Sequence, residues 1–232
     1  MEFNDRLKKS EIWSALILLA LHGVLLRCVL DILAARGFTG LSRSQLNVIY
    51  YGVSTALTLL LMGGYLRRGF DRLCENFLGC LNAFLLAWLL CWLLEYAVSF
   101  LILSLDLSGA NPNQNAINGL AGEDFGAATA VTVFLAPIVE ECIFRGGLFC
   151  GIRPYSRRWA YIVSMLLFAF YHVWEYAFFG DIRNLVFMLQ YLPAGFVLCR
   201  CYEKSGSVWT GIFFHMSHNY LSMSALRLLL QS

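Results

Sequence analysis

The chain has 232 residues, of which 59% are hydrophobic and only 14% are charged. A soluble domain carries about 25% charged residues, so this composition excludes an ordinary soluble fold and indicates a membrane protein. The formal net charge of +2 gives no indication of nucleic-acid binding, and we expect no nucleic-acid partner. The apolar runs are long and lack alternation of apolar and polar residues, which favours transmembrane helices over a transmembrane barrel.

Seven stretches are long and apolar enough to be interpreted as membrane spans. Their approximate ranges are 12–33, 46–66, 78–105, 125–152, 159–177, 184–202 and 207–230. An eighth span could be hidden in the long third stretch or in a re-entrant piece. The predicted fold class is therefore all-α, a polytopic transmembrane helical bundle of seven to eight spans. We expect residues 1–232 to form a single domain, because the chain has no internal repeat and no soluble segment of domain size.

Basic residues gather on one side of these predicted spans. If the N-terminus is cytoplasmic, the outside segments hold only Arg36, Arg43, Arg183 and Arg227. The inside segments then hold Arg6, Lys8, Lys9, Arg67, Arg68, Arg72, Arg153, Arg157, Arg158, Arg200 and Lys204. This asymmetry predicts an integral, multi-pass protein with a cytoplasmic N-terminus. The short chain favours a bacterial or archaeal plasma membrane over the endoplasmic reticulum, and the orientation suggests substrate entry from the cytoplasm.

The longest polar interruption runs from Asp106 to Asp124 and is rich in Asn and Gly. We interpret it as an external loop, because these residues favour turns and the segment has no basic residue. The eight cysteines fall within predicted spans or near their cytoplasmic edges, so free thiols are expected.

Residues 140–145, Glu-Glu-Cys-Ile-Phe-Arg, lie in an otherwise apolar span that also contains Pro137. An ionised side chain at a helix centre costs roughly 2.5–3.5 kcal/mol on insertion scales, and such residues are usually functional. Arg145 lies one turn after Glu141 on the same helix face, so an ion pair between them is expected. Glu140 points about 100° away around the helix and stays available for chemistry.

Three further polar residues lie at a similar depth on two later spans. These are His172 in the fifth span and His215 and Asn219, one turn apart, in the seventh. With a rise of ~1.5 Å per residue, Glu140, His172 and Asn219 each lie about 18–21 Å from the cytoplasmic end of their span, and His215 about 13 Å. The four groups are therefore expected to converge near the middle of the bilayer, within the part of the chain that carries the chemistry, about 125–230.

Such a set could hydrolyse an amide with activated water. A carboxylate beside a histidine can remove a proton from water. A histidine and an asparagine amide on another helix can donate hydrogen bonds to a developing oxyanion. No cofactor and no metal are expected for this chemistry.

The three patterns resemble the motifs of the CAAX protease and bacteriocin-processing family, also called the Abi family. They are Glu-Glu-x-x-x-Arg at 140–145, Phe-x-x-x-His at 168–172 and His-x-x-x-Asn at 215–219. The family includes the type II CAAX prenyl endopeptidases, and the resemblance implies an intramembrane endopeptidase of the glutamate type.

On this resemblance, Glu140 and His172 activate the water, and His215 and Asn219 form the oxyanion hole. Glu141 and Arg145 hold the geometry of the site, and Phe168 is a packing residue. The expected partners are a peptide or lipidated protein substrate and the membrane lipid.

Three alternatives remain open at this point. In a zinc-dependent intramembrane protease, Glu140, His172 and His215 or His218 would bind the metal. However, the chain has no His-Glu-x-x-His helix, and the nearby arginine disfavours a dication. A proton-coupled transporter could use the same Glu and His groups as a relay. A non-catalytic immunity protein could bind a peptide without cutting it. Outside these schemes, His218 is expected to pack or to make a hydrogen bond.

Overall fold

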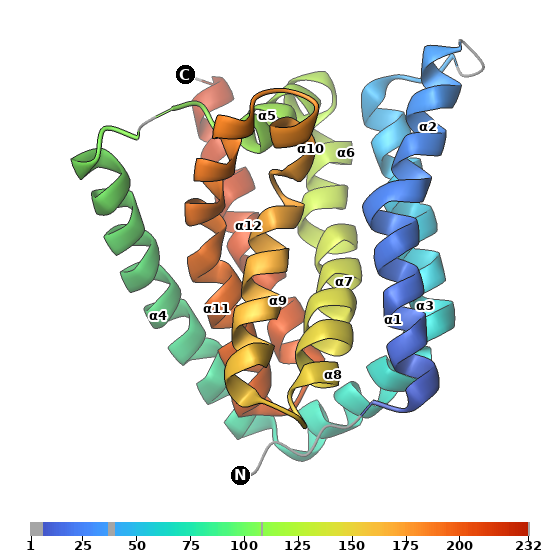
Figure 1. Ribbon diagram of the computed structural model, residues 1–232, viewed down its shortest axis with the longest axis vertical. Coiled ribbons are helices and arrows are strands. Elements are labelled where there is room, and N and C mark those ends of the chain that lie inside the picture. Colours follow the sequence, from blue (N-terminus) through green and yellow to red (C-terminus); the bar gives the residue numbers. More distant parts are fainter. Residues whose placement is uncertain (1–6, 37–39, 108, 232) are drawn as a thin grey trace.

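The computed structural model describes residues 7–36, 40–107 and 109–231, apart from the side chains of Asp31 and Ala34. Arg6, counted among the predicted inside residues, lies outside this part. Throughout the described residues the regular structure is helical, which confirms the all-α fold class. The helices stand side by side in one bundle, and α1 (Lys9–Ala20) begins at the opposite end from the last turn of α12 (Val208–Gln231) (Figure 1).

The helices follow one another with few long connections. Between α1 and α12 the order is η1 (Leu21–Leu25), α2 (Leu26–Ala35), α3 (Arg43–Glu75), α4 (Phe77–Ser104), α5 (Pro112–Glu123), α6 (Phe125–Thr129), η2 (Ala130–Leu135), α7 (Ala136–Glu141), η3 (Cys142–Phe149), α8 (Cys150–Ile152), α9 (Arg157–Tyr171), α10 (Trp174–Phe178), η4 (Ile182–Phe187) and α11 (Met188–Ser205). The segments η1, η2 and η3 are π-helical and η4 is a 3₁₀ helix.

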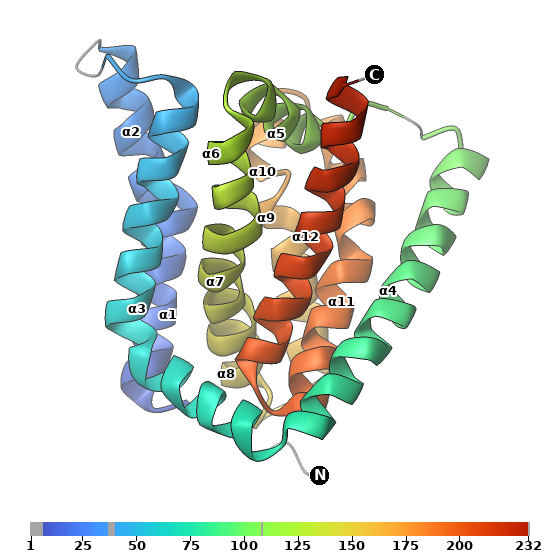
Figure 2. The same ribbon diagram turned by 180° about the vertical axis from the view of Figure 1, so that it is seen from behind.

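Three groups of helices make up the bundle. The continuous rod α1–η1–α2 pairs with α3 on one side, and α6–α8, α9, α11 and α12 form the centre (Figures 1 and 2). On the other side α4 leans away from the centre toward its C-terminal end, while the last turns of α3 pass beneath the centre to reach it (Figure 2). We call the end with the α3–α4 junction and α8 the lower end, and the end with α5 and α10 the upper end.

Among the described residues, five helical segments are long and apolar enough to cross a membrane: Lys9–Leu30, Arg43–Glu75, Phe77–Ser104, Phe125–Ile152 and Ile182–Ser205. Two predicted spans, 159–177 and 207–230, are outside this set. In the first of them the α-helix α9 has only 15 residues and ends at Tyr171. The second is α12, whose middle is rich in His, Ser and Asn. The number of spans therefore stays a prediction.

The lipid-facing character of the bundle is clearest on α4. Its outward side chains include Leu78, Leu89 and Trp92, which are 78%, 60% and 64% exposed. Such a large exposed apolar surface would be unfavourable in water and suits contact with lipid. In contrast, the side chain of Arg145 is fully buried at the centre. The bundle thus presents large apolar side chains on its outside and buries a few charged groups within a largely apolar core.

The expectation of a loop over 106–124 is wrong for most of its length, because Pro112–Glu123 forms α5. The side chain of Asn111 accepts hydrogen bonds from the backbone N–H groups of Asn113 and Gln114, so it caps the helix. Pro112 occupies the first turn, where its missing N–H has no cost. The same Asn and Pro residues that favour a turn also start a helix, and no apolar periodicity distinguishes the two in this polar segment.

The connection between α11 and α12 is fixed to the lower end of α3. Gly206 ends α11 with a φ of 68°, in the left-handed region where glycine is favoured. Ser207 then donates a hydrogen bond of 2.6 Å from its hydroxyl to the carbonyl of Gly69, and the Trp209 indole donates to the carbonyl of Leu66 at 2.8 Å. These bonds set the position of α12, which carries part of the candidate site.

The close approach of α1 to η3 depends on glycine. A Cβ placed on Gly147 would lie 2.5 Å from the Cβ of Ala15, a distance that real Cβ atoms do not reach. A Cβ on Gly151, one turn later, would meet no atom within 4 Å. The packing of the first rod against the centre of the bundle therefore requires the small residue at position 147.

We predict that Gly147→Ala lowers the free energy of unfolding by about 1–3 kcal/mol, the usual cost of overpacking. Gly151→Ala is the matched control and should leave it nearly unchanged. Unfolding of the purified protein in detergent micelles measures both. Adding Ala15→Gly to Gly147→Ala should restore part of the loss, and equal stability of the two single variants would contradict this account.

Candidate active site

The carboxylate of Glu140 lies between two imidazole rings from two other helices. Its Oε2 atom is 3.9 Å from Nε2 of His172, at the end of α9, and 3.9 Å from Nε2 of His215, on α12. The Glu140 side chain is only 5% exposed, and its Oε2 has no hydrogen-bond partner among the described residues. The predicted convergence of an acid and two imidazoles therefore occurs in the structure, and the carboxylate oxygen that faces both rings is unpaired.

Glu141 bridges its own helix and α12. Its Oε1 accepts a hydrogen bond of 3.0 Å from Nη1 of Arg145, the expected ion pair one turn apart, and lies 3.0 Å from Nδ1 of His215. Because this oxygen already accepts from a guanidinium, Nδ1 of His215 is the donor. Nε2 is then the ring nitrogen that His215 turns toward Glu140.

The Arg145 guanidinium is held on three sides. Besides Glu141, its Nη2 donates to the carbonyl of Gly195 on α11 at 3.2 Å, and its carbon lies 4.4 Å from the centre of the Phe168 ring. Phe168 is buried and also packs against the rings of His172 and His215. The buried charge is therefore paired, hydrogen-bonded and stacked, which is what a guanidinium out of water requires.

His172 is oriented by a backbone carbonyl and a tyrosine. Its Nδ1 is 2.8 Å from the carbonyl oxygen of Phe168, which can only accept, so Nδ1 carries the proton. The Tyr191 ring stacks on the imidazole with 4.4 Å between ring centres and an angle of 22°. The Tyr191 hydroxyl in turn accepts from the amides of Asn111 and Asn113, at the start of α5. Neutral His172 therefore presents an Nε2 lone pair toward Glu140.

Asn219 lines the same cavity, and its side-chain amide is hydrogen-bonded to a backbone carbonyl. Its Nδ2 donates a 2.8 Å hydrogen bond to the carbonyl of Thr132, in the π segment η2. The Ala136 N–H bonds to Val131, and Pro137, the next residue along the π turn, has no N–H. The Thr132 carbonyl consequently lacks a helical donor, and Asn219 replaces it. The second N–H of the amide is left for another acceptor.

A cavity of about 1070 Å³ contains the site. Glu140, His172, His215 and Asn219 are all in its wall. The rest of the wall comes largely from the upper end of the bundle, from α5, α10 and the first turns of α3. The cavity therefore extends from the catalytic candidates toward the upper end, away from the basic lower end where α1 begins (Figure 1).

The motifs gave no indication of two other parts of this cavity. Tyr191 stacks on His172 from α11, and Glu95 on α4 lies 2.8 Å from Nε2 of His218. His218 thus makes the hydrogen bond that was expected of it. Intramembrane charge was the available signal for Glu95, whereas nothing in the sequence separates Tyr191 from other tyrosines of the chain.

A helical membrane bundle that holds a carboxylate and two imidazoles in an internal cavity has the parts expected of an intramembrane protease. Residues 123–221 match the family model described as "Type II CAAX prenyl endopeptidase Rce1-like", and all six predicted site residues lie within them. The match confirms the resemblance found from the three motifs and shows that these residues are similar to a CAAX-type protease family. No match was found among curated proteins or solved structures.

We predict that Arg145→Ala destabilises the protein by about 3–5 kcal/mol, because it leaves the Glu141 carboxylate buried without its cation. The double variant Glu141→Gln with Arg145→Met should lose much less, because it removes both charges. Arg158→Ala, at an exposed position of α9, serves as the control. Denaturant unfolding in micelles measures all three, and a single variant as stable as the control would contradict a structural role for the pair.

Proposed function

We propose that this protein is an intramembrane endopeptidase that hydrolyses a peptide bond with water activated by Glu140 and His172. The observation that carries the proposal is the unpaired, buried Oε2 of Glu140, 3.9 Å from the Nε2 atoms of two histidines in a cavity wall. The family match supports peptidase chemistry, and the glutamate mechanism is argued from this geometry.

Two acceptors that face one another across 3.9 Å suit a single water molecule. Glu140 offers a carboxylate oxygen, and His172 offers the lone pair of Nε2 because its Nδ1 proton is used by Phe168. A water that donates one hydrogen to each is oriented with its oxygen lone pairs toward a substrate carbonyl. Glu140 then takes the proton as the oxygen attacks, and can pass it to the leaving amine.

His215 and Asn219 would stabilise the oxyanion. Asn219 keeps one N–H after its bond to Thr132. His215 uses Nδ1 toward Glu141, so it donates from Nε2 only when both nitrogens carry protons. Glu141 therefore acts through His215 and Arg145 and is a positioning residue. No cofactor is needed for these steps.

The proposed substrate is a membrane-associated or prenylated CAAX-type peptide or protein. The bundle surface is apolar and the cavity lies within it, so a substrate held by a lipid group would arrive already close to the site. Such a substrate, together with the membrane lipid, makes up the partners that we propose.

The alternatives differ in the support that they receive. The described residues include one group of three His, Cys, Asp or Glu side chains whose ligand atoms lie within 4.8 Å of each other, and it is not the Glu140 set. A zinc-dependent protease at Glu140, His172 and His215 would lose cleavage on chelation and regain it when zinc is added back. A proton-coupled transporter or a non-catalytic peptide-binding immunity protein is separated from a peptidase by cleavage itself.

We predict that Glu140→Gln abolishes cleavage of a fluorogenic, membrane-inserted peptide library by the purified protein, because an amide cannot take the proton from water. The thermal unfolding midpoint should change little, since Oε2 makes no hydrogen bond within the described residues that the substitution would remove. Glu175→Gln is the matched control, because Glu175 also lines the cavity but pairs with Arg27 instead of the histidines. Cleavage that persists in Glu140→Gln would refute the proposed base.

The position of the cavity bears on the side from which the substrate would enter. The basic residues that orient the chain lie at the lower end, whereas the cavity extends to the upper end. If the lower end is cytoplasmic, the substrate enters from the opposite side of the membrane, contrary to our expectation of cytoplasmic entry. We therefore propose entry from the non-cytoplasmic side.

We predict that a membrane-impermeant maleimide labels Gly119→Cys in intact bacterial cells that produce the protein. Gly119 is exposed in the cavity wall on α5, and a Cβ there meets no atom within 4 Å. Cys74, exposed at the lower end of α3, is the internal control and should react only after permeabilisation. A Cys28→Ser background removes the other exposed thiol. If Cys74 reacted in intact cells and Gly119→Cys reacted only after permeabilisation, the result would contradict non-cytoplasmic entry and favour cytoplasmic entry.

A further inference from the structure

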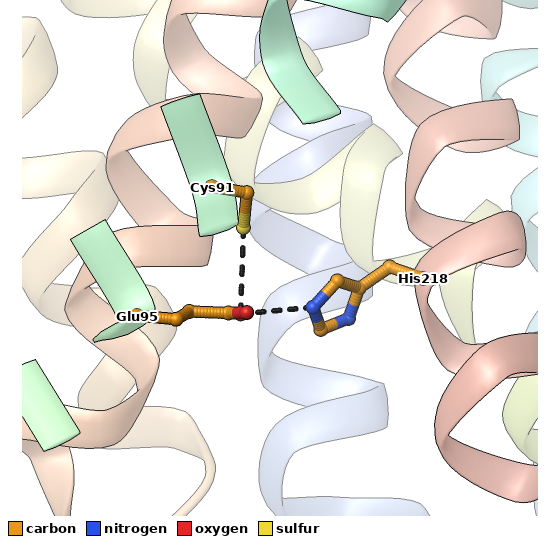
Figure 3. A group of neighbouring side chains, drawn as sticks. All are labelled: Cys91, Glu95 and His218. Atoms are coloured by element: carbon orange, nitrogen blue, oxygen red, sulfur yellow. Dashed lines mark hydrogen bonds and ion pairs between the residues drawn. The ribbon is translucent and has the colours of Figure 1, made fainter. Parts of the chain in front are cut away.

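A second polar cluster lies in the membrane part of the bundle, on α4 and α12. Cys91 and Glu95 are one turn apart on α4, and His218 faces them from α12 (Figure 3). Oε1 of Glu95 is 2.8 Å from Nε2 of His218 and 3.4 Å from Sγ of Cys91. The carboxylate thus lies between a thiol and an imidazole, and all three ligand atoms are within 4.8 Å of one another.

We propose that Cys91, Glu95 and His218 bind a zinc ion. Zinc accepts thiolate, imidazole and carboxylate ligands at about 2.0–2.3 Å, which places tetrahedral ligand atoms roughly 3.3–3.7 Å apart. The Cys91–Glu95 separation already fits this range. The Glu95–His218 separation must increase by about half an ångström, and both side chains have room, because they are 32% and 24% exposed.

The charges of this set balance those of the ion. Cys91 loses its thiol proton to solvent when the metal binds, so the thiolate and the Glu95 carboxylate together neutralise Zn²⁺. His218 contributes the neutral lone pair of Nε2. A site with no net charge is favourable in a medium of low dielectric, where a bare carboxylate or dication is not. By contrast, the Glu140 set has an arginine one turn away.

The surroundings leave one coordination position open. Cys91 is fully buried behind the cluster, whereas Glu95 and His218 line the catalytic cavity. The ring of Trp88 lies 5.7 Å from that of His218 and limits its rotation. Three protein ligands and a water from the cavity would complete a tetrahedral zinc.

Bound zinc would fasten α4 to α12. The upper part of α4 leans away from the centre of the bundle (Figure 2), and His218 directly precedes Asn219 on α12. A metal at this point would therefore fix the wall of the cavity between these two helices. Neither the binding nor this clamp depends on the proposed peptidase function.

The test uses Co²⁺ as the probe, on the full chain in detergent after removal of metals by a chelator. The starting protein carries Cys28→Ser and Cys74→Ser, so that exposed thiols do not bind cobalt. We expect one Co²⁺ per chain, visible bands of four-coordinate cobalt and a near-ultraviolet charge-transfer band from a thiolate–cobalt bond. Zinc should displace the cobalt and raise the thermal unfolding midpoint.

Variants assign the ligands. Cys91→Ser should remove the charge-transfer band. Glu95→Gln and His218→Gln should each weaken Co²⁺ binding by at least roughly 10–100-fold, which is the loss seen when a residue that only supports a metal ligand is mutated. Cys80→Ser is the matched control, a buried cysteine on the same helix, and should keep the band. If Cys91→Ser does not fold, the Co²⁺ affinities of Glu95→Gln and His218→Gln, at the two partly exposed positions, still test the proposed site.

The proposal is overturned if no stoichiometric binding occurs, or if the band and affinity are unchanged in the three ligand variants. Because the readouts are spectroscopic and thermal, loss of zinc binding and loss of peptidase activity are scored separately. A protein that binds cobalt as described but cuts no peptide would support the zinc site and reject the proposed function.

Discussion

The carboxylate of Glu141, shared between Arg145 and His215, is the interaction on which the rest of the site depends. It joins a buried cation one turn away on its own helix to an imidazole on α12. An unpaired carboxylate at this depth would be strongly unfavourable, so the three groups hold one another in place. Glycine makes the approach possible, since a Cβ on Gly211 of α12 would lie 3.3 Å from Oε2 of Glu141. With Glu141 fixed, the neighbouring Glu140 must point to another side of the helix, toward the two imidazole nitrogens.

Much of this arrangement could be predicted because it depends on helical spacing. The positions of Glu141 and Arg145 are four apart, so their pairing needs no knowledge of the fold. The fold class followed from apolar runs, and the convergence of the acid and the histidines from their depth. These inferences need only the spacing of residues within one helix and the depth of a residue along its helix axis. Both can be calculated from residue numbers.

Contacts between helices could not be predicted in the same way. Tyr191 stacks on His172 and is hydrogen-bonded by the start of α5, a segment that was expected to be a loop. Glu95 pairs with His218 across the gap between α4 and α12. Both depend on how far helices rotate and lean, which no spacing within a single helix determines. The same holds for the proposed entry side, because charge at the helix ends orients the chain but does not tell which end of the bundle lines the cavity.

The π turns explain why Asn219 lies where it does. The helix that contains Pro137 is π-helical on both sides of the short α7, in η2 and η3. In η2 the Ala136 N–H bonds to Val131, five residues back, so it cannot serve Thr132. The next donor along a π turn would be residue 137, which is a proline and has none. The Thr132 carbonyl must find a partner elsewhere, and the Asn219 amide supplies it at 2.8 Å.

Because Pro137 has no N–H, the Thr132 carbonyl must bond to a residue of another helix, and this constrains the position of Asn219 on α12. It turns one N–H of Asn219 toward the backbone and fixes the plane of the amide, which in turn fixes the direction of the remaining N–H. In the proposed role of Asn219 as an oxyanion donor this matters, because a donor that had to reorient during the reaction would lose part of the stabilisation that its bond provides. Pro137 therefore helps to orient the Asn219 amide, although the two residues are far apart in sequence.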